Sequence, residues 1–196
     1  MSRDLENKKC QAILATAKEL FWKHGVKRVS IQEICKEAKT SKMTFYKFFD
    51  NKIDLAKTIL DLVFDEGIRE YKAIMAQDVS FVQKVKETLL AKARNSKDIS
   101  QEFIIDIYKN NDLGLLEYVY AKGEAMLDLV LDDYEQAQKD GYVRPGIKRE
   151  FMRYQLLKMR EMVLDEDLLS FYKSPQELTM ELTNFFFYGL LVNENL

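Results

Sequence analysis

Apolar residues recur at helical spacing along most of the chain. Between about Asn7 and His24 they fall three and four residues apart, the period of an amphipathic helix. The same period predicts helices over about 31–38, 41–48, 52–75, 80–95, 99–109, 113–139, 147–163 and 175–192. The pattern therefore predicts an all-α protein of about nine helices.

Residues that cap helices stand before the short helices near the N-terminus. Ser30 and Glu33 have the capping-box spacing, in which each side chain accepts a hydrogen bond from a backbone amide at the start of a helix. Thr40 and Ser41 precede the third helix, and Asn51 precedes the fourth. Three short helices and the start of a long one are thus predicted within about 50 residues.

The fourth helix contains no proline and no strong loop signal as far as about Met75. We therefore expect it to join two domains without a flexible linker: residues 1–52 and a larger helical domain, residues 53–196. Composition supports helices, since 7 Gly and 2 Pro in 196 residues are too few for the reversals of a sheet protein.

Charge divides the chain unevenly. Residues 1–60 contain 13 Lys and Arg against 7 Asp and Glu, a net charge of +6, whereas the remainder, with 17 basic and 25 acidic residues, carries −8. A basic head on an acidic body suggests that a polyanion meets one end only. Scattered surface charge would give the same totals, so the local motif has to decide.

A helix of six to eight residues beginning at Ser41 is too short to be stable alone. It must be held by its neighbour across the Lys39-Thr40 turn, which makes a helix-turn-helix whose second helix can enter a major groove. The helix N-terminus at Thr40 and Ser41 favours a phosphate. Three aromatic residues can pack inward, Phe45, Phe48 and Phe49, which leaves outward Lys42, Thr44, Tyr46 and Lys47.

The stretch Ser30–Leu55 resembles the DNA-binding domain of TetR-type transcriptional regulators. The likeness covers about residues 8–60 and rests on the capped second helix, Thr40-Ser41-Lys42, Phe45-Tyr46, Phe49, and Asn51-Lys52 followed by Leu55. Three positions depart from the family pattern. Lys39 replaces a turn glycine, so either a non-glycine adopts positive φ or the turn differs; Met43 replaces another glycine, and Phe48 replaces a His or Tyr that often contacts phosphate.

The resemblance implies a homodimer that binds a pseudo-palindromic operator in double-stranded DNA, most simply as a repressor, under control of a small-molecule effector of unknown identity. It places four residues toward bases or backbone, Lys42, Met43, Thr44 and Tyr46, and four where phosphates are held, Thr40, Ser41, Lys47 and Lys52. It also implies a four-helix dimer interface made by the last two helices, with candidate residues Phe151, Leu182, Phe185, Phe186 and Leu190.

The body offers less specific signals. Aromatic and sulfur-bearing side chains at helical spacing could line an effector cavity: Phe103, Tyr108, Tyr118, Met126, Tyr154, Met159 and Met162. Each could equally be ordinary core. The last helix is apolar all round from Phe185 onward, which indicates burial within the chain or against a second copy.

Two other classes of protein compete with a regulator. An enzyme is disfavoured because the single histidine, His24, lies beside Gly25 at a helix end and no metal-spaced Cys/His cluster, Gly-rich phosphate loop or Ser/His/Asp set is present. A helical adaptor that binds protein through its apolar tail is the second rival. We expect no cofactor and no metal, and with no apolar run longer than the eight residues Phe185–Val192, no membrane span and a cytoplasmic location.

Overall fold

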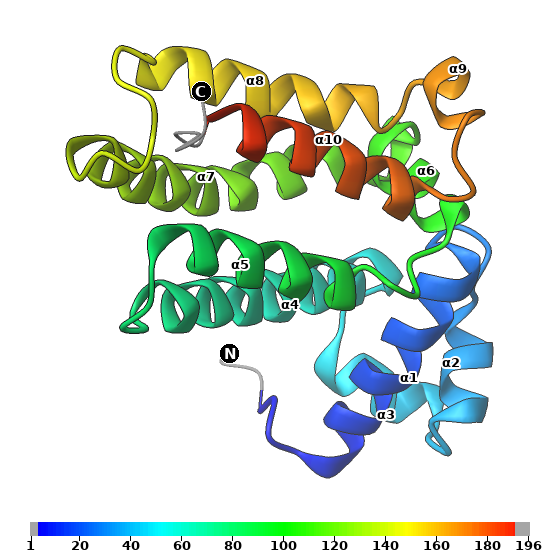
Figure 1. Ribbon diagram of the computed structural model, residues 1–196. Coiled ribbons are helices and arrows are strands. Elements are labelled where there is room, and N and C mark those ends of the chain that lie inside the picture. The colour runs from blue at the N-terminus through cyan, green and yellow to red at the C-terminus, as the bar shows by residue number, and fades with distance from the viewer. Residues whose placement is uncertain (1–3, 191–196) are drawn as a thin grey trace. The chain divides into compact units, whose positions relative to one another are not determined.

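The computed structural model describes residues 4–190 (Figure 1), and all regular structure in that range is helical. The helices are α1 (Lys8–His24), α2 (Ile31–Glu37), α3 (Lys42–Phe48), α4 (Lys52–Met75), α5 (Phe81–Asn95), α6 (Gln101–Tyr108), the 3₁₀ turn η1 (Asn111–Leu113), α7 (Leu116–Lys139), α8 (Arg149–Met162), α9 (Glu166–Leu169) and α10 (Pro175–Leu190). None of the helices in the described range combines the length and apolar composition that crossing a bilayer requires.

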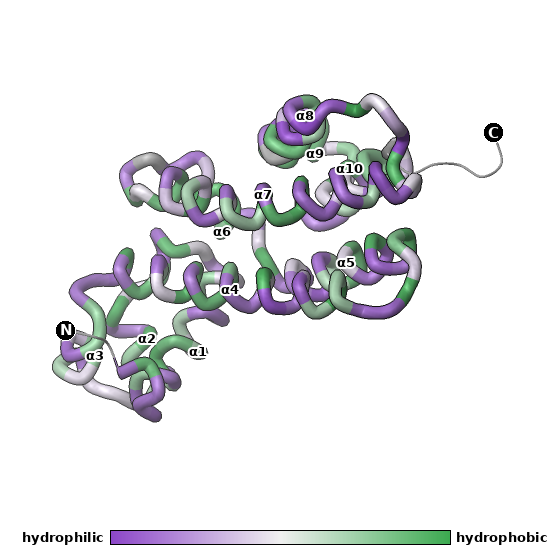
Figure 2. Tube along the Cα trace, turned by 90° about the vertical axis from the view of Figure 1, so that its left-hand side faces the viewer, coloured by the Kyte–Doolittle hydropathy of each residue, from purple (hydrophilic) through white to green (hydrophobic). Residues whose placement is uncertain are grey.

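The all-α prediction is confirmed, with ten α-helices in the described range where about nine were expected. The additional helix is α9, whose four residues are too few to show a period in the sequence. The predicted last helix extends to Val192, and residues 191–192 lie outside the described range. In Figure 2 the helices carry both apolar and polar positions, as the periodic pattern requires.

The predicted caps are present. The Ser30 hydroxyl accepts from the Glu33 amide at 3.1 Å and the Glu33 carboxylate accepts from the Ser30 amide at 3.4 Å, which completes the capping box. The Ser41 hydroxyl accepts from the Thr44 amide at 3.1 Å. The Asn51 side chain accepts from the amide of Asp54 at 2.9 Å, so α4 also begins where the sequence indicates.

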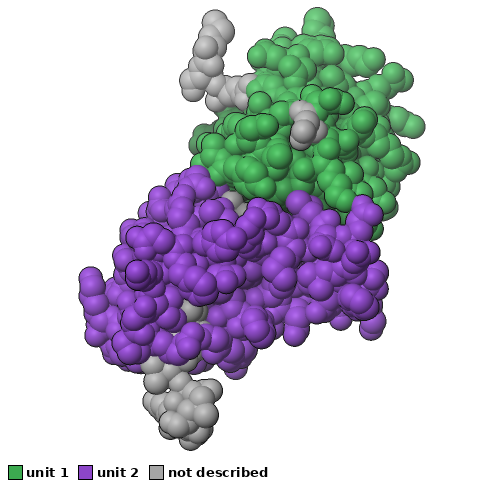
Figure 3. All heavy atoms as spheres, turned by 90° about the horizontal axis from the view of Figure 1, so that it is seen from above, with its two compact units in different colours: residues 1–66, 98–122 green, residues 67–97, 123–196 purple. Residues whose placement is uncertain are grey.

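The chain folds into two compact units, coloured separately in Figure 3. Residues 1–66 and 98–122 form unit 1, and residues 67–97 and 123–196 form unit 2. Unit 1 contains all of the predicted N-terminal domain and adds the start of α4, α6 and the start of α7. The functional boundary between residues 52 and 53 stays a prediction.

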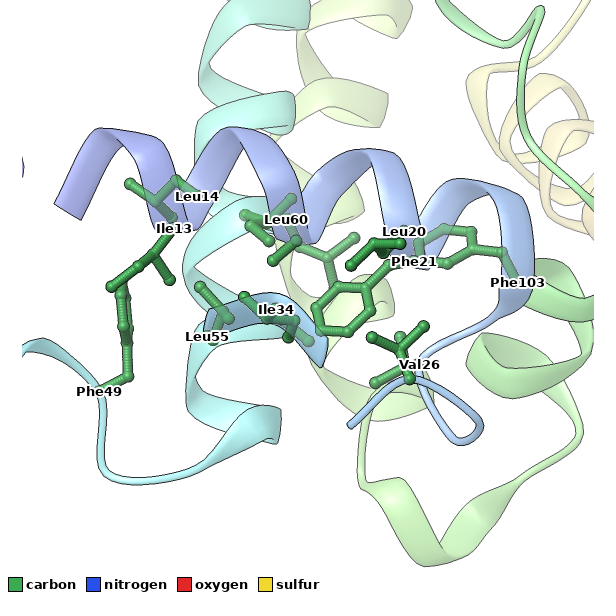
Figure 4. Packing of buried hydrophobic residues seen from close by; sticks show 14 of the residues in the cluster. Ile13, Leu14, Leu20, Phe21, Val26, Ile34, Phe49, Leu55, Leu60 and Phe103 are labelled. Carbon is green, nitrogen blue, oxygen red and sulfur yellow. The ribbon is translucent and has the colours of Figure 1, made fainter. Parts of the chain in front are cut away.

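The core of unit 1 holds the three short helices against α4 and α6 (Figure 4). Phe21 of α1, Ile34 of α2 and Phe45 of α3 are fully buried in it. Helix α6 joins this core through Phe103, whose ring lies 4.4 Å from that of Trp22 between centroids. Burial of such side chains is the main source of stability for helices as short as α2 and α3.

Unit 2 has its own core of α5, α7, α8 and α10 side chains. Tyr134 lies at its centre, with its ring centroid 5.1 Å from Phe81 and 5.3 Å from Phe187. Helix α8 is also tied to α7 by the Arg149 guanidinium, which lies 2.7 Å from both Asp132 and Glu135.

Candidate nucleic-acid interface

Helices α2 and α3 are each seven residues long and are joined by residues 38–41. The Thr40 amide donates to the Cys35 carbonyl at 2.9 Å, which closes the turn. Lys39 has φ 51°, so a non-glycine does occupy the left-handed region here. The turn of the helix-turn-helix is therefore kept although its usual glycine is absent.

One side of helix α3 is buried in the core, and the other side is exposed. Phe45 is 0% exposed, and Phe48 is half-buried against the same core. On the other side Met43 is 73% exposed and Tyr46 56% exposed. Met43 and Tyr46 are three residues apart and therefore share one side of the helix, and such an exposed pair makes this outward side a candidate interface.

The outward side also carries positive charge. Lys42 and Lys47 are both exposed, and the Lys42 ammonium lies 3.5 Å from the side-chain oxygen of Gln32 on α2. Gln32 is exposed too and was not among the predicted site residues. The pattern of apolar and polar positions does not distinguish one exposed glutamine from another, and Gln32 is recognised only by its contact with Lys42 in the folded protein.

Two of the three hydroxyl groups at the start of α3, those of Ser41 and Thr44, take part in contacts within the protein. Ser41 caps the helix, and its Oγ lies 3.0 Å from Thr44 Oγ1. The Thr40 hydroxyl oxygen is buried and makes no hydrogen bond within the described residues. These three predicted site residues therefore lie together, but Thr40 directs its hydroxyl away from solvent.

Lys52 differs from the other lysines of the predicted site. It is half-buried at the start of α4, and its ammonium donates to the carbonyls of Lys27 at 2.9 Å and Val29 at 2.6 Å. Burial lowers the pKa of this ammonium, and the Asp106 carboxylate opposes that effect. The structure thus ties Lys52 to the segment between α1 and α2.

The seven candidate effector residues are divided between the two units. Three lie in unit 1, where Phe103 is buried and Tyr108 and Tyr118 are half-buried against the core. Four lie in unit 2: Met126 and Met159 half-buried, Tyr154 and Met162 exposed. The structure does not collect all seven within either unit.

The predicted interface residues of the last helices differ in exposure. Phe185 of α10 is 83% exposed and Phe151 of α8 is also exposed. Leu182 and Phe186 are half-buried, the latter against the core of unit 2. The side chain of Leu190 lies outside the described part of the structure. Helix α10 therefore has one side that is buried and another side on which aromatic residues are exposed.

A short helix braced by its neighbour, with lysines and a tyrosine outward, defines the class of helix-turn-helix DNA-binding proteins. Residues 13–59 match the family of bacterial regulatory proteins called the tetR family. The uncharacterized HTH-type transcriptional regulator YdgC of Bacillus subtilis (strain 168) is 25% identical over 207 residues, covering 99% of this chain and 97% of its own. The match to the tetR family thus covers the helix-turn-helix segment of this chain, and the similarity to the Bacillus subtilis regulator extends over the rest.

Solved structures show the same fold over nearly the whole chain. The regulatory protein TetR of Rhodobacter sphaeroides gives a TM-score of 0.71 at 15% identity, over 92% of this chain and 98% of that chain. The fatty acid degradation regulator FadR of Bacillus halodurans gives 0.69 at 15% identity, over 90% and 93%.

Proposed function

We propose that the protein represses transcription as a homodimer, with α3 of each copy entering the major groove of one half of a pseudo-palindromic operator. The outward side of α3, where Lys42, Met43, Tyr46 and Lys47 are exposed on a braced helix, carries this proposal. Lysines supply phosphate contacts that fix register, and the tyrosine and methionine can reach base edges or thymine methyl groups.

The same proposal gives the aromatic side of α10 a role. Phe185 and Tyr188 of α10 and Phe151 of α8 are exposed within unit 2. A second copy of the chain is the occupant that a palindromic operator requires, since two identical heads must be joined by a two-fold axis. The exposed aromatic side chains of α8 and α10 would form that isologous interface.

Control by a small-molecule effector completes the proposal. The effector site would lie in residues 53–196, with the half-buried Met126 and Met159 among its candidate lining residues. Adaptable methionine side chains suit such a site. A regulator of this kind acts in the cytoplasm, where its operator lies.

Selection of bound duplexes from a random library, with electrophoretic mobility as the readout, tests the proposal. We expect a palindromic consensus and a shift that rising salt reverses. The same shift should weaken in Lys42→Ala and Lys47→Ala and persist in Lys86→Ala, an exposed lysine of α5. No shift on any duplex would contradict the proposal and favour a helical adaptor. A metabolite screen for release from the selected duplex would then identify the effector.

A further inference from the structure

A buried carboxylate of α6 holds the end of α1 and the residues that follow it. Asp106 is 6% exposed. Its Oδ2 accepts from the Lys27 amide at 2.7 Å, and its Oδ1 accepts from the Asn110 side chain at 2.6 Å. Both carboxylate oxygens are therefore used, and one of them reaches a backbone group 79 residues earlier in the chain.

Gly25 makes room for this carboxylate. A Cβ at position 25 would lie 2.5 Å from Asp106 Oδ2, and the glycine φ of +78° is one that other residues rarely adopt. The backbone amide of Ser100 also donates to the Trp22 carbonyl at 2.9 Å. The segment leading into α6 and the helix itself are thus fitted to the end of α1 at two places.

Lys52 holds the same segment from α4. Its ammonium donates to the carbonyls of Lys27 and Val29, while Asp106 accepts from the amide of Lys27. Residue 27 is therefore bound on its N–H by a carboxylate and on its C=O by an ammonium. Such charge-assisted hydrogen bonds are stronger than those between neutral groups.

We propose that Asp106 and Lys52 are positioning residues for DNA binding, which clamp residues 25–29 between α6 and α4 and so fix the start of α2. Ser30, the N-cap of α2, follows this segment directly, and α2 in turn supports α3. The proposal rests on the DNA binding proposed above. It gives Lys52 a role through the backbone, in contrast to the direct phosphate contact expected from the family resemblance.

The two roles of Lys52 predict different salt dependence. A lysine that neutralises a phosphate contributes about one unit to the slope of log affinity against log salt, and its removal takes that unit away. A lysine that positions the helices lowers affinity when removed but leaves the slope unchanged. Lys52→Met keeps the aliphatic stem and removes the ammonium, and Lys47→Met is the matched control at an exposed position of α3.

The experiment uses the full chain and a duplex that the wild type binds. In Asp106→Ala and in Lys52→Met we expect about tenfold weaker binding, an unchanged salt slope and faster hydrogen exchange of the Lys27 amide. Glu102→Ala, an exposed carboxylate one turn earlier on α6, should change none of these. Lys47→Met should reduce the slope by about one unit and leave the Lys27 amide protected.

Two further variants keep the proposal open to refutation if Asp106→Ala folds poorly. Asp106→Asn retains a hydrogen-bond acceptor and should recover part of the DNA affinity that Asp106→Ala loses. When Asp106→Asn is combined with Lys52→Met, the loss of affinity should be smaller than the sum of the losses in the two single variants. A slope reduced by one unit in Lys52→Met, or normal DNA affinity despite rapid exchange at Lys27, would overturn the proposal. If the wild type binds no duplex, the proposed function fails, while exchange at Lys27 still tests the clamp.

Discussion

Helices α3 and α10 each bury one aromatic residue and expose another, yet their surroundings differ. In α3, Phe45 is buried and Tyr46 is exposed between Lys42 and Lys47. In α10, Phe187 is buried and Phe185 is exposed, and the only charged residues of the helix are acidic. Exposure alone does not identify a partner. The charge beside an exposed ring separates a surface suited to a polyanion from one suited to another protein.

The two surfaces should therefore respond to different variables. Binding through α3 releases counterions and weakens steeply as salt rises. The proposed association through α8 and α10 would bury apolar area and depend on protein concentration far more than on salt. Substitutions in each helix can separate these behaviours.

Phe45→Ala should have the largest effect, because it removes a fully buried ring from the core of unit 1. We expect the free energy of unfolding to fall by about 3–5 kcal/mol, measured by denaturant titration. Met43→Ala, at an exposed position of the same helix, should change it by less than about 0.5 kcal/mol. Equal losses in the two variants would show that α3 does not bury Phe45 as described.

Phe185→Ala should act next most strongly, on association. The substitution is present in both copies of a dimer, so a cost of about 1 kcal/mol per copy sums to about 2 kcal/mol, and the dimer dissociation constant should rise about 30-fold. Sedimentation over a concentration series measures this. Leu90→Ala, an exposed residue of α5, is the control and should associate as the wild type does. A wild-type monomer at all concentrations would exclude the proposed interface.

Lys42→Ala and Lys47→Ala should each reduce the salt slope of DNA binding by about one unit, with weaker affinity for all duplexes. The reason is that each removes one exposed cation from the outward side of α3. Affinity measured at four or five salt concentrations gives the slope. The dimer dissociation constant should stay at the wild-type value, since neither lysine belongs to α8 or α10. An unchanged slope would remove that lysine from the interface.

Local features were predictable from the sequence because their causes are local. Ser30 and Ser41 predict the starts of α2 and α3, because an N-cap side chain accepts a hydrogen bond from a backbone amide only two or three residues later. The lysines and Tyr46 of α3 follow from its period, which assigns Phe45 to the core. The exposure of Phe185 could not be derived in this way, because a helix that reads as apolar all round does not reveal which side its own chain covers.

Hydrogen-bond partners that are far apart in the sequence could not be predicted from local patterns. Asp106 accepts from an amide 79 residues away, and Lys52 donates to carbonyls 23 and 25 residues away. No spacing rule links such pairs, because only the tertiary fold brings them together. The candidate effector residues show the same limit: helical spacing selected them, but it could not assign Phe103 and Met126 to different units.

Lys39→Gly should have the smallest effect and the opposite sign. Lys39 holds φ 51°, a conformation that costs a residue with a Cβ roughly 1–2 kcal/mol, while glycine adopts it freely but loses more backbone entropy on folding. The net expectation is a gain of about 0.5–1 kcal/mol, visible as a small rise in Tm. Lys36→Gly, within α2, should instead lose about 1 kcal/mol. Lys39→Gly also removes one exposed cation from the turn, but it leaves Lys42 and Lys47 in place, so the contributions of those two lysines to the salt slope should stay intact. A lower Tm in Lys39→Gly would mean that contacts of the lysine side chain outweigh the strain of its backbone.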